Sequence, residues 1–289
     1  MIVVTGASGQ LGKLVINFLL EKIPASEIIA AVRNPEKAKD LSELGVQVRQ
    51  ADYNDPESLT HAFKGAEKIL LISSSEIGQR TAQHINVIAA AKQANVRAIA
   101  YTSLLKADTS PLALASEHLE TEQELKASGV PFVILRNGWY TENYTASIPA
   151  ALAHNAFIGS AGDGKIASAA RQDYAAAAAT VLLNPVVSGT IYELAGDDAY
   201  TLAEFTNEIA KQSGKAVSYV NLSQDEFAAA LEGAGLPKPF ATLLADSDVG
   251  ASKGGLFDDS HQLSKLIGRP TMSYSSVIKA ALFINTAGI

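Results

Sequence analysis

The chain of 289 residues contains no cysteine, which excludes disulfides, thiolate catalysis and cysteine-ligated metals. Its five histidines show no spacing typical of a metal site. Lysine and arginine form no run and the net charge is −7, so a nucleic-acid partner is not expected. Apolar stretches such as 175–183 fall short of the roughly 18 residues that span a bilayer. Because an apolar strand begins at residue 2, leaving no room for a targeting segment, we expect a cytoplasmic protein without metal or membrane insertion.

A glycine-rich turn directly after the first apolar strand is the most informative feature that the chain does have. The turn consists of Thr5, Gly6, Ala7, Ser8, Gly9, Gln10, Leu11 and Gly12. Glycines permit a sharp reversal from strand to helix and let a pyrophosphate approach the main chain. The following helix would offer its unpaired N–H groups to the anion. Because a second strand follows at the distance that a βαβ unit requires, we predict a dinucleotide site; a plain structural turn is the alternative.

Arg33, at the end of the second strand, bears on the choice of cofactor. Sites for NAD usually place an acid here to bind the ribose 2′-hydroxyl, whereas an arginine accommodates a 2′-phosphate. The sequence at this point is Ala31-Val32-Arg33-Asn34, with no acid. We therefore predict NADPH as the cofactor, in preference to NADH. Alternatively, Arg33 is a surface residue before a helix that Asn34 and Pro35 begin, and both interpretations can hold together.

Short apolar runs alternate with helical patterns through the first half of the chain. Strands are expected at 2–5, 28–32, 46–51, 68–73, 98–103 and 132–136, and helices near 10–22, 35–44, 56–63, 79–94 and 112–127. Because nearly all-apolar strands in such alternation indicate a parallel sheet covered on both faces, we predict an α/β, Rossmann-type, doubly wound fold. Ligands of such sheets bind at the carboxyl ends of the strands.

The second half of the chain is less regular. A loop or hairpin of small residues at 159–165 precedes an alanine-rich helix at 171–183 and a strand at 191–194. Thr201 and Ser223 each begin a capping box, a short strand is expected at 217–220, and helices are expected near 259–267 and 275–284. We predict an NADP-binding domain of residues 1–140, to which 171–198 returns, and a smaller, mainly helical C-terminal lobe of 141–170 plus 199–289.

Polar and aromatic side chains follow several of the expected strands. Asp52 could accept a hydrogen bond from an adenine amino group, and the neighbouring Tyr53 could pack on the base. The hydroxyls of Ser73, Ser74 and Ser75 and the amide of Asn137 suit a ribose and a carboxamide, and Trp139 beside Tyr140 suits a flat apolar ring. The alternatives are that the serine run caps a helix and that Trp139 belongs to the core.

Residues 5–12, Arg33, 51–53, 136–140, 170–175 and 256–260 together resemble the NmrA-like branch of the atypical short-chain dehydrogenases/reductases. Within it the chain is more similar to the bacterial NADPH:quinone oxidoreductases than to the triphenylmethane reductases. The resemblance implies direct reduction of a quinone by NADPH without a flavin. It also implies that the cofactor is lined by Gly6, Ala7, Ser8, Gly9, Gln10, Leu11, Arg33, Ser73, Ser74, Ser75, Asn137, Gly138, Trp139, Tyr140, Thr141, Glu142 and Arg171.

One departure from the wider superfamily affects the expected mechanism. Short-chain dehydrogenases commonly use a Tyr-x-x-x-Lys pair to move the proton of an alcohol or carbonyl, whereas this chain has His118 and Glu122 at the corresponding positions. We therefore expect neither alcohol oxidation nor sugar epimerisation. Reduction of a quinone gives a hydroquinone anion whose charge is spread over the ring, so orientation of the reactants can suffice.

We expect Asn137 and Ser74 to position the nicotinamide, and Ser74, Trp139, Tyr140 and Asn143 to shape the quinone site. His118, with an ordinary pKa of about 6.5, is a candidate proton donor, although a structural histidine is the favoured interpretation. Two other functions stay open: a non-catalytic, NADP-binding redox sensor, and a reductase of another acceptor such as a dye or nitro compound.

Overall fold

The computed structural model describes residues 1–286, and the chain divides into two compact units. The first unit contains Met1–Ala107, Ser116–Asn137 and Arg171–Tyr192. The second contains Asp108–Ala115, Gly138–Ala170 and the chain from Glu193 onward. Residues 138–140 and 193–198, predicted for the first domain, are thus grouped with the second unit. The last three residues of the predicted lobe lie outside the described residues.

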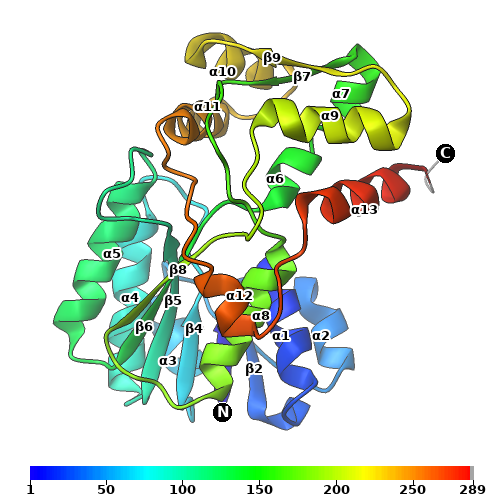
Figure 1. The fold of residues 1–289 in the computed structure, drawn as a ribbon. Coiled ribbons are helices and arrows are strands. Elements are labelled where there is room, and N and C mark those ends of the chain that lie inside the picture. The colour runs from blue at the N-terminus through cyan, green and yellow to red at the C-terminus, as the bar shows by residue number, and fades with distance from the viewer. Residues whose placement is uncertain (287–289) are drawn as a thin grey trace. The chain divides into compact units, whose positions relative to one another are not determined.

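The first unit is built around a twisted sheet with the strand order β3-β2-β1-β4-β5-β6-β8 (Figure 1). Its strands are β1 Ile2–Thr5, β2 Ile28–Val32, β3 Gln47–Gln50, β4 Lys68–Leu71, β5 Ala98–Leu104, β6 Phe132–Asn137 and β8 Thr190–Leu194, of which the last two residues are grouped with the second unit. The pairs from β3 across to β6 are all parallel, and Val4 of β1 lies between Ala30 and Leu70. The predicted doubly wound fold is confirmed. The strand order reverses between β1 and β4, where such sheets bind ligands.

Helices cover both faces of this sheet because its strands are apolar on both sides. They are α1 Gln10–Leu20, α2 Lys39–Glu43, α3 Pro56–Ala62, α4 Arg80–Gln93, α5 Ala115–Ser128 and α8 Arg171–Leu183. One face packs against α3, α4 and α5 through a buried core that includes Leu59, Val87 and Leu125. The other face carries α1, α2 and α8, with α1 and α8 side by side (Figure 1).

The helix predicted over 35–44 is in fact a 3₁₀ turn followed by the short helix α2. The 3₁₀ turn Pro35–Ala38 starts at the predicted cap, because the side chain of Asn34 accepts a hydrogen bond from the Glu36 N–H at 3.0 Å. A second 3₁₀ turn, Ala25–Glu27, precedes β2. The path of the chain directly after Arg33 is therefore fixed by local capping.

The second unit is mainly helical, as predicted, with one small sheet. Its elements are α6 Thr141–Thr145, α7 Ile148–His154, β7 Ala156–Gly159, α9 Leu202–Ser213, β9 Ser218–Asn221, α10 Gln224–Gly233, α11 Lys238–Ser252, α12 Gln262–Ile267 and α13 Tyr274–Thr286. Both predicted capping boxes are present at α9 and α10. Sequence analysis missed α11 and missed β7, which pairs in parallel with β9 at the start of the segment expected to be a loop.

Candidate functional site

The turn between β1 and α1 has the geometry of an anion-binding loop. Gly6 adopts a φ of +58°, which a side chain would strain. At Gly12 an added Cβ would lie 2.7 Å from the Cα of Ala7, so only glycine allows the helix to approach the turn this closely. Gly9 caps α1 without a side-chain hydrogen bond, and the first turn of the helix carries no acid. The N–H groups that begin α1 are thus available to a phosphate.

Thr5 and Tyr53 hold this turn against the neighbouring strands. The Thr5 hydroxyl donates to the Leu70 carbonyl at 2.9 Å and accepts the Ile72 N–H at 3.1 Å. The Tyr53 hydroxyl donates to the Ile72 carbonyl at 2.8 Å and also contacts the Thr5 hydroxyl, and burial raises the pKa of Tyr53. This geometry favours a structural role for Tyr53 over the predicted packing on an adenine ring. Asp52 beside it is half-buried, and its carboxylate accepts the Asn54 N–H at 2.9 Å.

Arg33 follows β2, and its side chain is 67% exposed. It has an acidic partner, which comes from another segment of the chain. Its guanidinium lies 2.6 Å from Oε1 of Glu76. The other oxygen of Glu76 accepts a hydrogen bond from the Gln83 side chain at 2.8 Å. Sequence analysis found no acid at the strand tip, and nothing in the local sequence could have indicated one 43 residues further along the chain.

The segment that carries Ser73, Ser74 and Ser75 is the β4 loop, residues 72–79, between β4 and α4. The Ser73 N–H donates to the Thr102 hydroxyl at 2.9 Å, and the Ser74 hydroxyl accepts the Glu76 N–H at 3.1 Å. The residue that caps α4 is Gln79, without a side-chain bond. The serine run therefore does not cap this helix, and the alternative interpretation of the run is wrong.

A buried histidine that sequence analysis did not single out fixes the main chain of this loop. Nε2 of His84 accepts the Ser74 N–H at 2.9 Å, so Nδ1 carries the proton and donates to the Thr121 hydroxyl at 2.9 Å. Burial, followed by the charge of Arg80, lowers the pKa of His84 to about 3. Arg80 adds a hydrogen bond of 2.8 Å from Nε to the Ser74 carbonyl, and it pairs with Glu117 at 2.9 Å. The main chain at Ser74 is therefore held on both sides.

At the end of β6, Asn137 presents a buried acceptor. Its Oδ1 atom has no hydrogen-bond partner among the residues that the structure describes. A buried acceptor without a partner is rare in proteins, and a ligand amide would satisfy it. That Asn137 positions a carboxamide stays a prediction. Arg171, also predicted to line the cofactor, is the first residue of α8, which packs beside α1.

The predicted residues Gly138 to Asn143, directly after Asn137, belong to the second unit. Gly138 donates its N–H to the Leu194 carbonyl at 2.7 Å, and the main chain of Trp139 and Thr141 pairs with Ala169. The Trp139 side chain is only 8% exposed, as expected for the core alternative. By contrast, Tyr140, Glu142 and Asn143 are half-buried.

His118 and Glu122, at the positions of the missing Tyr-Lys pair, are both buried on α5. Nδ1 of His118 is hydrogen-bonded to the Tyr101 hydroxyl at 2.7 Å. Burial, followed by the charge of Arg80, lowers the pKa of His118 well below 6.5. Glu122 accepts two hydrogen bonds from Arg136 at 2.8 Å. These contacts favour the structural interpretation of His118 over the proton donor.

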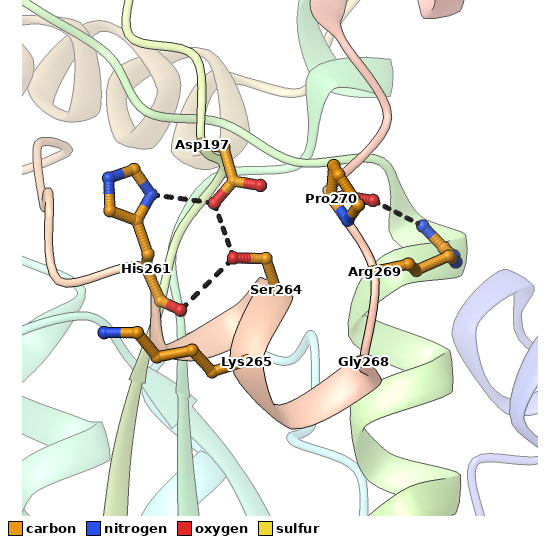
Figure 2. A pocket seen from close by; sticks show the side chains of 7 residues that line it. All are labelled: Asp197, His261, Ser264, Lys265, Gly268, Arg269 and Pro270. Carbon is orange, nitrogen blue, oxygen red and sulfur yellow. Dashed lines mark hydrogen bonds and ion pairs between the residues drawn. The ribbon is translucent and has the colours of Figure 1, made fainter.

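A surface hollow of about 420 Å³ lies elsewhere, in the second unit, lined by Asp197, His261, Ser264, Lys265, Gly268, Arg269 and Pro270 (Figure 2). The His261 ring and the Ser264 hydroxyl both point to Asp197, with bonds of 2.8 and 2.7 Å. The other oxygen of Asp197 accepts the Thr271 N–H at 2.9 Å. These bonds join the segment after β8 to α12, so we assign them a structural role. None of the predicted site residues lines this hollow.

Within residues 1–286, no group of histidine, aspartate and glutamate side chains is arranged to hold a metal ion. Over the same range, every helix is too short or too polar to cross a membrane.

The first unit fits a dinucleotide with a 2′-phosphate on three counts. The glycine turn offers N–H groups to a pyrophosphate, and Arg33 offers an exposed guanidinium. Asn137 offers a buried acceptor that has no partner within residues 1–286. These three groups stand at the carboxyl ends of parallel strands β1, β2 and β6.

Comparison with known proteins agrees with this geometry. The chain is 61% identical to quinone oxidoreductase 2 of Escherichia coli, over 99% of this chain and 100% of that protein. The crystal structure of an E. coli NADPH-dependent quinone oxidoreductase complexed with NADPH matches with a TM-score of 0.95 at 62% identity, covering 98% and 100% of the two chains. The Citrobacter triphenylmethane reductase complexed with NADP(H) matches with a TM-score of 0.93 at 40% identity, covering 97% and 100%. A family model described as NAD(P)H-binding matches residues 6–185, and the chain belongs to this family.

Proposed function

We propose that the chain is an NADPH-dependent quinone reductase that transfers a hydride directly from NADPH to a quinone, without a flavin. The observation that carries this choice of reaction is the state of His118 and Glu122. Both side chains are buried and bonded within the protein, to Tyr101 and Arg136 respectively. A site without the usual proton-transfer pair suits an acceptor that needs no protein acid, and a quinone is such an acceptor.

The identity and structural likeness to the E. coli quinone oxidoreductase support the same activity. NADPH, when bound, supplies the hydride. The residues proposed to hold it begin with the phosphate turn, Gly6, Ala7, Ser8, Gly9, Gln10, Leu11 and Gly12, and continue with Arg33, Asp52, Ser73, Ser74, Ser75, Asn137, Gly138, Trp139, Tyr140, Thr141, Glu142 and Arg171. Arg33 would pair with the 2′-phosphate and the Asn137 Oδ1 atom would accept from the carboxamide.

For the quinone, the proposed contacts are Ser74, Trp139, Tyr140 and Asn143. The Ser74 N–H donates to His84, and Arg80 donates to the Ser74 carbonyl. These two bonds fix the position of Ser74 through its main chain, and neither uses its side chain. Orientation of the two reactants, rather than acid catalysis, would then account for the rate. A cytoplasmic location stays a prediction from the sequence.

The test is to follow the absorbance of NADPH with purified protein and a panel of soluble benzoquinones and naphthoquinones. No flavin is added, and NADH is measured in parallel. The proposal expects oxidation that depends on quinone and is faster with NADPH. Tight binding of NADP without turnover of any acceptor would instead support the redox sensor.

A dye reductase is the second candidate, supported by the 40% identity to the triphenylmethane reductase. It differs only in the acceptor. A triphenylmethane dye in the same panel decides between them by the ratio of kcat/KM for dye and quinone.

A further inference from the structure

The ion pair between Arg33 and Glu76 bears on cofactor choice, and the proposed function makes no use of it. Oε1 of Glu76 lies 2.6 Å from Nη1 of Arg33, and the two side chains are 40% and 67% exposed. The second oxygen of Glu76 accepts from Gln83 at 2.8 Å. Because Gln83 is buried on α4, it gives the carboxylate a fixed anchor beside the guanidinium.

A carboxylate and a phosphate seek the same N–H groups of a guanidinium. In the free protein Glu76 occupies a donor that a 2′-phosphate would need, and its charge repels the incoming phosphate. NADH carries an uncharged hydroxyl at this place and does not compete for the guanidinium. The effect of Glu76 on binding therefore differs between the two cofactors.

We propose that Glu76 is a specificity-determining residue, which competes with the 2′-phosphate of NADPH for Arg33 and so limits the preference for NADPH over NADH. The inference rests on the proposed function only in taking Arg33 as the residue for the 2′-phosphate. The hydrogen bond from Arg33 lowers the pKa of Glu76, so the carboxylate is charged at neutral pH.

Glu76→Gln tests this competition, because glutamine keeps an acceptor for Gln83 and removes only the charge. Binding of 2′,5′-ADP and of 5′-AMP is measured by calorimetry, and binding of NADPH and NADH by fluorescence, at one fixed salt concentration. We expect 2′,5′-ADP and NADPH to bind about two- to fivefold more tightly to the variant, the range typical of exposed ion pairs. Binding of 5′-AMP and NADH is expected to stay unchanged.

Glu67→Gln is the matched control. Glu67 forms an exposed pair with Arg97 at 3.1 Å, next to the amino ends of β4 and β5, so this variant loses the same charge at the opposite edge of the sheet. It should bind all four nucleotides like the parent. In an Arg33→Ala background, Glu76→Gln should no longer change the binding of 2′,5′-ADP.

The inference would be overturned by no change in any affinity, by equal tightening of both adenine nucleotides, or by persistence of the effect without Arg33. Weaker binding of 2′,5′-ADP to Glu76→Gln would overturn it as well, because Glu76 would then orient Arg33 for the phosphate. Since no quinone is present, the outcome is independent of whether the chain turns over quinones.

Discussion

Arg136 donates two hydrogen bonds to the Glu122 carboxylate, from Nε and from Nη2, each 2.8 Å long. The Ser103 hydroxyl donates a third at 2.7 Å, and both charged side chains are almost completely buried. In the wider superfamily, position 122 would hold the lysine that acts on a catalytic tyrosine. Here a carboxylate stands at that position, and Arg136 and Ser103 both donate to it. The pair thus belongs to the core of the first unit and leaves no proton-transfer chemistry at this place.

We predict that Glu122→Gln lowers the free energy of unfolding by about 3–5 kcal/mol, because it removes the carboxylate charge that faces the buried Arg136 guanidinium. Chemical denaturation measures the loss. The exposed-pair variant Glu67→Gln should lose less than about 1 kcal/mol. The double variant Glu122→Gln/Arg136→Met, which removes both charges, should recover most of the stability. A single variant as stable as the parent would contradict the structural role.

The sheet and the helices of the first unit could be predicted because each follows from a local periodic pattern. The helix α11 was missed because its local sequence is not typical of a helix. Its second residue is Pro239 and its interior includes Gly250, which together resemble a loop, yet proline is tolerated in the first turn of a helix. Packing favours the glycine there, since an added Cβ would lie 2.6 Å from the Leu112 side chain.

In the candidate site too, local motifs could be predicted from the sequence, and contacts between distant segments could not. The glycine-rich turn of residues 5–12 and Arg33 are local motifs that follow strands, so both could be proposed from the sequence. The partners Glu76 of Arg33 and His84 of Ser74 depend on the path of the β4 loop, which no sequence period encodes. The sequence likewise could not show that the Asn137 Oδ1 atom is buried without a partner in the described part of the chain.

His118→Gln is predicted to leave the pH dependence of quinone reduction around neutral pH unchanged. Burial, followed by the charge of Arg80, holds the pKa of His118 well below 6.5, so the ring is neutral around pH 7. Positioned general acids typically contribute about 10²- to 10⁴-fold, so kcat should fall by much less than tenfold. Stopped-flow rates across the pH series test this. A loss of about a hundredfold, with one limb of the profile flattened, would assign the donor role to His118.

Arg33→Ala is predicted to weaken NADPH binding by about ten- to a hundredfold, the range for a lost charge-assisted hydrogen bond. NADH binding should change little, because its ribose hydroxyl carries no charge to pair with a guanidinium. Fluorescence titration with both cofactors gives the two dissociation constants. Arg97→Ala, an exposed arginine at the other edge of the sheet, is the control and should affect neither. Equal losses for NADPH and NADH would contradict the 2′-phosphate assignment.

Asp248 in the second unit makes stability depend on pH. It is buried, accepts the Tyr144 hydroxyl at 3.0 Å and the Ser160 N–H at 2.9 Å, and burial raises its pKa from 3.8 to about 6. Between pH 3.8 and about 6, Asp248 is therefore protonated in the folded chain and ionised in the unfolded chain. Stability contributed by this group is therefore present at low pH and is lost as the pH rises from about 4 to about 6.

Asp248→Asn should remove this dependence. The asparagine oxygen can accept the Ser160 N–H while its amide donates to the Tyr144 hydroxyl, so both contacts persist without a charge. The free energy of unfolding of the variant minus that of the parent should be about 1–3 kcal/mol larger at pH 7 than at pH 4.5. Thermal unfolding midpoints across this range measure the difference, with the exposed Asp259→Asn as the control. If the midpoints of the parent and of Asp248→Asn change with pH in parallel, the buried carboxyl does not titrate as inferred. A neutral asparagine cannot reproduce a pH dependence that comes from ionisation of Asp248.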